Sequence, residues 1–464
     1  MTLKMRRIIV LAMVLIVIVA GGAALAVRAT RGSIVVATVA LNGASGDGAM
    51  IADEWNGAIL VEDTITATSP AAGASQQPVL RMLDGADGRL VGIVPLVANL
   101  DAPFVDRTTG RLLSLANLGG YGHPFAVTAV DLARRTTLYT TALPLPPTVR
   151  LMGGYGMQGA AGPGGIVVDD GAGHILAASR VTFGGMGRIT FPDRGLTMLD
   201  ARTGRLLRTV YLPAVPTYLA LDARTHHAFV SGGIGSLWLV DSRTGMVQRT
   251  LSSGYTTGVV VDERAHRALV SGPTGLRILD THGGRLLTTV AIPGLFHAPL
   301  MVSGGRALAA SFGWGAWHRG MLRLLDTRRG RVVWTTPLAG APLALATDAR
   351  RGRAYVETCA FGPTQPQCAF SIAVIALADG RVQRAIALSS TATVSAMTVD
   401  TRTGHLFIAS QRGPPLPVVD PWSGIRNLPP FALPFLPRAV QPTPGAGSAG
   451  ATRQGSVIVL DIDH

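Results

Sequence analysis

One pattern recurs along the 464-residue chain: an apolar run, an aspartate, three variable positions, a glycine, often an arginine, and a second apolar run. Three copies are LTMLDARTGRLLRTVYLP at 196–213, LRILDTHGGRLLTTVAIP at 276–293 and LRLLDTRRGRVVWTTPLA at 322–339. The apolar runs are short and rich in Val, Leu and Ile, as in β-strands. Asp accepts hydrogen bonds from nearby backbone N–H groups, and Gly adopts the positive φ that a tight hairpin needs. The pattern therefore predicts hairpins whose turn formers, rather than catalytic acids, are Asp200, Gly204, Asp241, Gly245, Asp280, Gly284, Asp326 and Gly330.

A second pattern alternates with the first. It is seen as YLALDARTHHAFVSG around Asp222, GVVVDERAHRALVSG around Asp262 and AMTVDTRTGHLFIAS around Asp400. Together the two patterns give units of four strands and about 40 to 50 residues, which is the period of a β-propeller blade. We count eight units, with seven as the alternative because the turns at Asp131 and at 303–306 are the weakest. The sequence thus predicts an all-β propeller of four-stranded blades.

The two ends of the propeller region complement each other. Residues 30–43, TRGSIVVATVALNG, resemble a fourth strand that has no unit of its own. Residues 455–464, GSVIVLDIDH, end after a third strand. A spare strand at one end and a vacancy at the other predict that the two segments pair and close the ring, which removes an exposed sheet edge.

The repeat resembles a known family. The stretch AFVSGGIGSLWLVDSRTGMVQRTL at 228–251 is similar to the YVTN-type repeats of surface-layer-like bacterial β-propellers. In pattern the resemblance covers most of 43–464, and it is close from about 195 to 338. The signature letters appear here as AFVSG, ALVSG or AYVET, so the match is to the repeat pattern. Membership would imply a propeller fold and an exported location, but no particular activity.

The N-terminal residues favour export. Lys4, Arg6 and Arg7 precede IIVLAMVLIVIVAGGAALAV at 8–27, an apolar run long enough to cross a bilayer as a helix. We therefore predict a signal or anchor segment at 1–31 and a propeller domain at 32–464, with the chain held outside the cytoplasm by its N-terminal helix. AALA at 23–26 also resembles a signal-peptidase site, so secretion after cleavage is the alternative.

The distribution of charge, the cysteines and the short motifs of the sequence limit which partners, disulfides, cofactors and metals are expected. The net charge of +14 is spread along the chain without a basic run, so no nucleic-acid partner is predicted. The only cysteines, Cys359 and Cys368, flank a loop with Pro and Gly, and in an exported protein they predict a disulfide. GYGMQG at 154–159 fits a dinucleotide-binding pattern but no helix follows it, and no His pair has metal-ligand spacing. We predict neither a cofactor nor a metal.

The long insertions of the sequence are predicted to share one end of the propeller. In the strand register above, 61–77, 144–165, 180–195, 312–320, 359–368 and 411–455 all connect second to third strands, or one blade to the next. Elaborated loops on a rigid scaffold are typical of a binding surface. GWGAWHRG at 313–320 adds aromatic groups suited to stacking on a ligand, with the alternative that its tryptophans cover the apolar end of their own blade. The candidate ligand-binding or partner-binding residues are His123, Tyr155, His297, Trp314, Trp317 and His318.

The opposite end is predicted to carry a ring of positive charge. An arginine follows the turn glycine at Arg89, Arg111, Arg205, Arg285, Arg331, Arg353 and Arg381. With the N-terminal segment retained as an anchor, this ring could contact anionic lipid headgroups, although exposed arginines often serve only to solvate strand ends.

Two functions follow from this organisation. The first is a non-enzymatic cell-surface module that binds an unknown protein or cell-surface polymer through the insertion-rich end. The second is an exported propeller enzyme, such as a lactonase, a lyase or a quinoprotein-like dehydrogenase, with its site at the mouth of the central channel. The loops contain few titratable groups that could converge there, so binding is favoured over catalysis.

Overall fold

The structure is a computed structural model. It describes residues 35–41, 50–69, 73–106, 108–117, 125–143, 156–157, 165–178, 183–184, 195–214, 216, 218–232, 234–272, 274–292, 300–312, 320–361, 368–388, 392–412 and 455–462. These residues form strands and turns and contain no helix. None of them therefore supplies a helix that could cross a membrane, and the apolar segment at 8–27 lies outside them.

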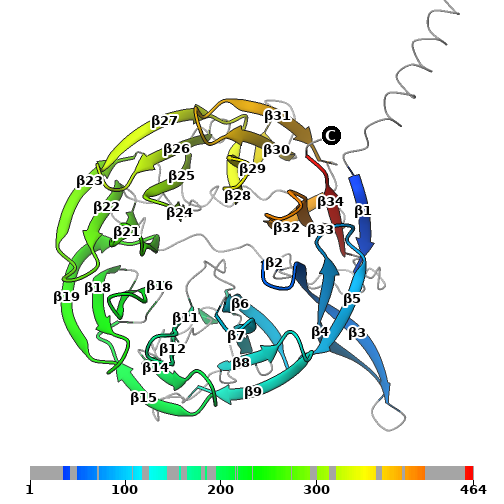
Figure 1. Cartoon of the computed structure of the whole chain (residues 1–464), viewed down its shortest axis with the longest axis horizontal. Helices are drawn as coiled ribbons and strands as arrows, with labels where there is room; N and C mark the ends of the chain where they lie inside the picture. Colours follow the sequence, from blue (N-terminus) through cyan, green and yellow to red (C-terminus); the bar gives the residue numbers. More distant parts are fainter. Residues whose placement is uncertain are drawn as a thin grey trace, which may run out of the picture.

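Eight four-stranded sheets stand around a ring (Figure 1), so the prediction of eight blades is confirmed and the seven-blade alternative is wrong. Blade 1 contains β2 (Met50–Asp53), β3 (Ala58–Ser69), β4 (Gly73–Asp84) and β5 (Leu90–Pro95), and blade 2 contains β6 (Asn99–Asp106), β7 (Arg111–Asn117), β8 (Phe125–Asp131) and β9 (Thr136–Ala142). Blade 3 contains β11 (Ile166–Asp169), β12 (His174–Ala178), β14 (Gly195–Asp200) and β15 (Leu206–Tyr211), and blade 4 contains β16 (Tyr218–Asp222), β17 (His227–Ser231), β18 (Ile234–Asp241) and β19 (Val247–Tyr255).

Blades 5 to 8 repeat the arrangement. Blade 5 contains β20 (Gly258–Asp262), β21 (Arg267–Gly272), β22 (Gly275–Asp280) and β23 (Leu286–Ala291), and blade 6 contains β24 (Leu300–Ser303), β25 (Arg306–Phe312), β26 (Gly320–Asp326) and β27 (Arg331–Pro337). Blade 7 contains β28 (Ala341–Asp348), β29 (Arg353–Phe361), β30 (Cys368–Ala376) and β31 (Val382–Ala387), and blade 8 contains β32 (Ala392–Val399), β33 (Leu406–Arg412), β34 (Gly455–Leu460) and β1 (Val35–Ala40).

Blade 8 combines strands from both ends of the chain. Its order is β32, β33, β34, β1, and β1 pairs antiparallel with β34 from Val35 opposite Leu460 to Ala40 opposite Ser456. The innermost strand of blade 1, β2, contacts the innermost strand of blade 8, β32. The first and last blades are thus neighbours in the ring.

The hydrophobic core lies between the blades. Blade 5 packs Leu276 and Ile278 against Ala307 and Leu325 of blade 6, and equivalent clusters occupy other blade boundaries. The alternating side chains of each strand face the two neighbouring blades, which is why the strands read as nearly continuous apolar runs. Trp238 is among the largest fully buried side chains.

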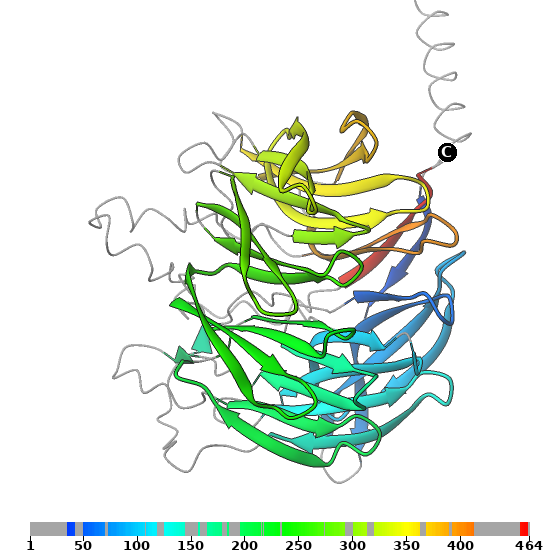
Figure 2. The same cartoon turned by 60° about the vertical axis from the view of Figure 1, so that its left-hand side comes forward.

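The antiparallel order divides the connections between two ends of the ring. Turns between first and second strands, which we name inner turns, and between third and fourth strands, which we name outer turns, share one end, the turn face (Figure 2). The remaining connections share the loop face. All the long insertions predicted from the sequence join strands at the loop face.

One predicted loop is largely strand. We expected 61–77 to be an irregular insertion, but β3 and β4 continue into it as a hairpin of twelve residues a side, from Ala58 opposite Asp84 to Ser69 opposite Gly73 (Figure 1). β-Branched Thr and Ile residues recur in this segment and favour extended backbone. Two short strands outside the blades, β10 (Gly156–Met157) and β13 (Phe183–Gly184), also pair with each other.

Candidate functional site

The six residues predicted to bind a ligand or partner belong to connections of the loop face. His123 lies between β7 and β8, Tyr155 between β9 and β11, His297 between β23 and β24, and the group Trp314, Trp317 and His318 between β25 and β26. All six lie outside the described residues. Their end of the propeller follows from the flanking strands, and their roles stay predictions.

The predicted turn formers have the expected geometry. The N–H of Gly204 donates to the carbonyl of Asp200 over 2.8 Å, and Gly204 has a φ of 71°. The Asp200 carboxylate accepts the backbone N–H of Arg202 at 3.1 Å and of Thr203 at 2.8 Å. Hydrogen bonds from the hydroxyl and N–H of Thr203 lower the pKa of Asp200. The turns at Asp241, Asp280 and Asp326 repeat this arrangement, with Gly245, Gly284 and Gly330 at positive φ.

Two inner turns carry a histidine where the other inner turns have glycine. His226 and His266 have φ values of 58° and 52°, a conformation that costs free energy for any residue except Gly. Each side chain reaches the preceding blade. His226 Nδ1 lies 2.7 Å from Asp169 Oδ2, and His266 Nδ1 lies 3.2 Å from Asp222 Oδ2. Both carboxylates are buried, so the histidine bonds offset a desolvation cost.

Donors other than histidine also reach buried inner-turn carboxylates, at the boundary of blades 3 and 4 and at the boundary of blades 5 and 6. The hydroxyl of Ser242, in the outer turn of blade 4, donates to Asp169 of blade 3. Asp262 of blade 5 accepts the N–H of Gly305 at 2.7 Å and the hydroxyl of Thr327 at 3.4 Å, both from blade 6. Asp169, Asp222 and Asp262 therefore hold neighbouring blades together, a role that the repeat pattern alone does not reveal. The signal was present in DARTHH and DERAHR, where His replaces the turn Gly.

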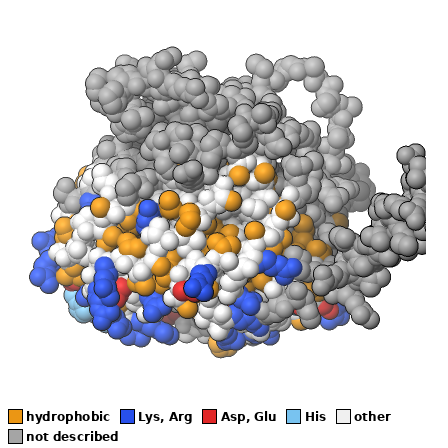
Figure 3. Space-filling view, turned by 90° about the horizontal axis from the view of Figure 1, so that it is seen from above, with side chains coloured by type: hydrophobic (Ala, Val, Ile, Leu, Met, Phe, Trp, Pro, Cys, Tyr) orange, Lys and Arg blue, Asp and Glu red, His pale blue; other side chains and the backbone are white. Residues whose placement is uncertain are grey.

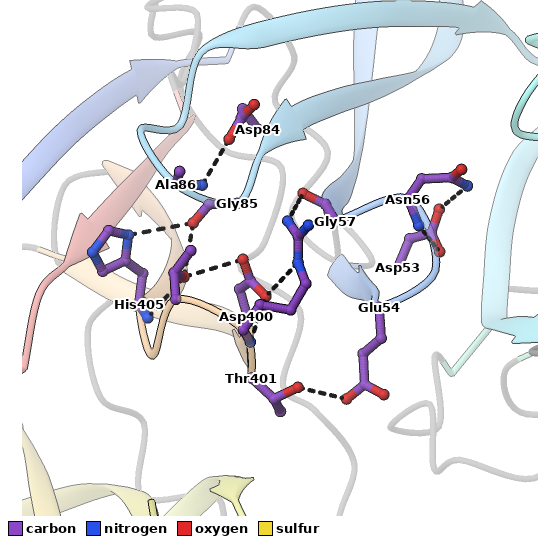
Figure 4. A network of polar contacts seen from close by, with 12 residues as sticks. Asp53, Glu54, Asn56, Gly57, Asp84, Gly85, Ala86, Asp400, Thr401 and His405 are labelled. Atoms are coloured by element: carbon purple, nitrogen blue, oxygen red, sulfur yellow. Dashed lines mark hydrogen bonds and ion pairs between the residues drawn. The ribbon is translucent and has the colours of Figure 1, made fainter. Parts of the chain in front are cut away.

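The boundary between blades 8 and 1 uses other donors (Figure 4). Arg402 Nη2 donates to the carbonyl of Gly57 over 2.9 Å, and the Thr403 hydroxyl donates to the carbonyl of Gly85 over 3.1 Å. The Thr401 hydroxyl also donates to Glu54 Oε1 over 3.2 Å. Side chains of one blade thus satisfy the backbone of the next across the junction of the two chain ends.

Fourth strands contact the outer turn of the following blade. The Tyr139 hydroxyl donates to the carbonyl of Ala201 over 2.9 Å, and Trp334 Nε1 donates to the carbonyl of Leu377 over 3.1 Å. Burial raises the pKa of Tyr139 to about 12. This phenol is a structural donor that stays protonated at physiological pH. The polar groups just below the turn face therefore bond neighbouring blades to each other.

The exposed layer of the turn face is rich in arginine (Figure 3). Arg89, Arg205, Arg285, Arg331 and Arg381 follow outer turns and are exposed. Arg111 and Arg353, which the sequence placed in the same ring, follow inner turns and are only partly exposed. The predicted ring therefore consists of an exposed outer set and a partly covered inner set.

Two buried glutamates occupy equivalent positions in blades 1 and 7. Glu62 and Glu357 each lie nine residues after the inner-turn aspartates Asp53 and Asp348. Glu62 Oε1 accepts the backbone N–H of Leu100, in blade 2, over 3.1 Å. Among the described residues Glu357 Oε1 has no hydrogen-bond donor, and burial raises the pKa of Glu357 to about 8.

An ion pair is buried beside the N-terminal strand. Arg81 Nε lies 2.6 Å from Asp63 Oδ2, and Arg81 Nη1 donates to the carbonyl of Ala40, the last residue of β1, over 3.4 Å. The repeat pattern alone did not predict the buried glutamates or this ion pair. The available signal was a charged residue inside an apolar strand, as in AILVED at 58–63 and RAYVET at 353–358.

The described residues offer no metal centre: no group of three or more His, Cys, Asp or Glu side chains lies close enough to hold an ion there. Cys359 lies in β29 and Cys368 begins β30, the next strand of the same sheet. Cys368 is opposite Phe361, two residues beyond Cys359. The predicted disulfide would therefore join adjacent strands at the loop-face end of blade 7.

No family model matches the chain, and no curated protein matches its sequence. Solved structures do match its fold. The dihydro-heme d1 dehydrogenase NirN in complex with DHE has a TM-score of 0.54 at 14% identity, covering 82% of this chain and 69% of that one. The computationally designed Ika8 protein gives 0.52 at 12% identity, with 80% and 95% covered. BamB from Moraxella catarrhalis gives 0.50 at 11% identity, with 81% and 94% covered. At these identities the comparisons establish the β-propeller fold alone.

Proposed function

We propose that this chain is an exported, membrane-tethered β-propeller that binds a partner protein or a surface polymer through its loop face. The observation that carries the proposal is the division between its two faces. The turn face is built from tight turns whose polar groups bind neighbouring blades. Every long insertion joins strands at the loop face. Variable loops on a rigid scaffold are the usual site of recognition.

Sequence features support the location. The basic residues Lys4, Arg6 and Arg7 and the apolar run at 8–27 have the form of an exported N-terminus, and the YVTN-type resemblance has the same implication. A Cys359–Cys368 disulfide would suit an oxidising compartment. The pairing of β1 with β34 would also lock the ring by joining the two ends of the chain in one blade.

Site-specific photo-crosslinking tests the binding face. The full chain carries benzoylphenylalanine either at Trp317, on the loop face, or at Met246, an exposed position on the turn face. We expect a recurrent macromolecular adduct from Trp317 and none from Met246, with both variants retaining the parent unfolding temperature. The same adduct from both positions, or none from Trp317 and a set of other loop positions, would contradict the proposal.

The alternative, an exported propeller enzyme, is favoured by one observation. Glu357 is a buried carboxylic acid with a pKa raised to about 8 by burial, and such groups occur at catalytic sites as well as in structural cores. NirN, named as a dehydrogenase, shows that a chain of this fold can be an enzyme. The alternative predicts that the purified chain opens lactones, or oxidises a substrate with a dye acceptor, and that Glu357→Gln abolishes the activity without unfolding the protein.

A further inference from the structure

We propose that the turn face lies against an anionic lipid bilayer, so that the propeller presents its loop face away from the membrane. The inference rests on the membrane tether of the proposed function and adds an orientation and a lipid-contacting surface to it. Three features of the structure support it: the direction of β1, the layering of charge on the turn face, and the apolar side chains exposed there.

The direction of β1 determines the face from which the N-terminal segment arrives. Val35 is opposite Leu460, which lies next to the last outer-turn position, whereas Ala40 is opposite Ser456 near the loop face. The strand therefore starts at the turn face. Residues 28–34 separate it from the end of the apolar run, and seven residues reach at most about 25 Å when fully extended. A bilayer that holds 8–27 must lie within that distance of the turn-face end of β1.

Charges on the turn face are layered. Arg205, Arg285 and Arg331 are exposed, and within the described part of the chain their guanidinium groups make no hydrogen bond or ion pair. Most inner-turn carboxylates, including Asp169 and Asp222, are buried beneath the surface. The exposed carboxylates described on this face are Glu54, Asp87, Asp170, Glu263 and Asp379, and outer-turn aspartates such as Asp200, Asp280 and Asp326 are partly exposed.

This arrangement of charges favours a phosphate group that directly contacts the exposed arginines. A headgroup phosphate that touches a guanidinium is closer to it than to the carboxylates below, and salt screens charges beyond about 8 Å. Arginine binds phosphate with two parallel hydrogen bonds. Each basic residue near an anionic surface adds to the attraction. Several such residues together would hold the turn face on the membrane without a deep pocket.

Apolar side chains accompany the arginines. Trp55, in the inner turn of blade 1, is 67% exposed, and Trp is enriched where proteins meet the membrane interface. Every blade also exposes a large aliphatic side chain near the turn-face end of its outermost strand: Val35, Leu90, Leu138, Leu206, Met246, Leu286, Val332 and Val382. Figure 3 shows arginines along one edge of the ring with apolar side chains above them. Because the arginines are outermost, contact is expected at the headgroup level.

Spin-label accessibility tests the orientation in the full chain, reconstituted into nanodiscs that contain either neutral or 30% anionic lipid. Nitroxides are placed at Leu286→Cys and Ala291→Cys, exposed positions at the turn-face and loop-face ends of the same strand, β23. In anionic discs we expect collisions with an aqueous nickel complex to fall at least twofold at position 286 and to stay unchanged at position 291. High salt and the triple variant Arg205→Gln, Arg285→Gln, Arg331→Gln should reverse the fall.

The outcomes separate the two proposals. A chain that does not migrate with the discs overturns the tether and the docking together. If the chain migrates with the discs but both labels remain equally accessible in anionic lipid, the docking is wrong and the tether stands. Spin–spin broadening at position 286 in both lipids would show that a second copy covers the face, which also overturns lipid docking. The parent chain, labelled in parallel, controls for reaction at Cys359 and Cys368.

Discussion

The turn face and the loop face are made from the same strands, yet they use their residues differently. On the turn face, aspartates such as Asp169 and Asp262 accept hydrogen bonds from the next blade and are almost fully buried. On the loop face, connections of very different length join the same strands. One face repeats because neighbouring blades must contact each other there, whereas the other can vary because its loops do not determine the blade interfaces. The difference suggests that stability depends chiefly on the turn face and recognition on the loop face.

Loss of β1 should have the largest effect on stability. Deleting 35–40 from the chain leaves β34 as an open edge and uncovers apolar groups that include Val457 and Val459. We expect the unfolding temperature to fall by about 5 °C or more, since about 1 kcal/mol corresponds to roughly 1 °C in a domain of this size and the deletion removes several such contributions. Calorimetry of the purified protein measures this. A variant that unfolds like the parent would show that the shared blade does not support the ring.

Removing one buried turn carboxylate should have the next largest effect. Asp169→Ala leaves His226 and Ser242 without their acceptor at the boundary of blades 3 and 4. We expect it to cost about 2–4 kcal/mol of the free energy of unfolding. Asp87→Ala, at an exposed carboxylate of the same face, is the matched control and should change that energy by less than about 0.5 kcal/mol. Equal effects in urea titrations would contradict the distinction between buried and exposed turn carboxylates.

Glu357 tests whether ionisation of a buried carboxylic acid away from the turns lowers the free energy of unfolding. Its pKa is raised from 4.5 to about 8 by burial, so between these pH values the folded state binds more protons than the unfolded state. The free energy of unfolding should therefore fall as pH rises through this window. Glu357→Gln removes the charged form. We expect it to match the parent near pH 4.5 and to exceed it by about 4 kcal/mol at pH 8, since each unit of pKa shift corresponds to about 1.4 kcal/mol.

A difference between Glu357→Gln and the parent that is the same at pH 4.5 and pH 8 would show that burial does not raise the pKa of Glu357 in the folded blade. The measurement is a series of denaturant titrations across this range of pH. The result also bears on the enzyme alternative, because a catalytic acid needs a pKa in this region.

The smallest effect on stability is expected on the loop face. The proposed function assigns Trp314 and Trp317 to partner binding, so replacing both by alanine should shift the unfolding temperature by less than about 2 °C. The same variant should lose the crosslinked partner captured at neighbouring loop positions. A drop in stability similar to that of Asp169→Ala would mean that the two tryptophans pack onto their own blade.

Much of the fold could be predicted because its signals are local. The apolar runs, the Asp–Gly turns and their spacing gave eight four-stranded blades and located the turns of every unit, including the shortened one at 303–306, where β24 ends at Ser303 and β25 begins at Arg306. The pattern also assigned the long insertions to one face. It mistook 61–77 for a loop, because alternating Thr and small residues resemble a linker until their pairing partner is known.

The candidate residues of the loop face remain predictions from the sequence, since they lie outside the described residues. The polar contacts between blades could not be predicted in the same way. His226 and Asp169 are 57 positions apart, and nothing in the spacing of either turn indicates that they meet. Glu62 and Glu357 share a position in the repeat, but only the neighbouring blade supplies a donor to one of them.

The sequence by itself determined most of the strands and where the chain reverses between them, because these depend on side-chain periodicity and on the conformational preferences of Asp and Gly. Only the tertiary structure decided which of many similar aspartates are buried, which residue of the next blade reaches each of them, and that the blades number eight rather than seven. Those features arise from contacts between residues far apart in the chain, and their energies exist only once neighbouring sheets have packed and excluded water.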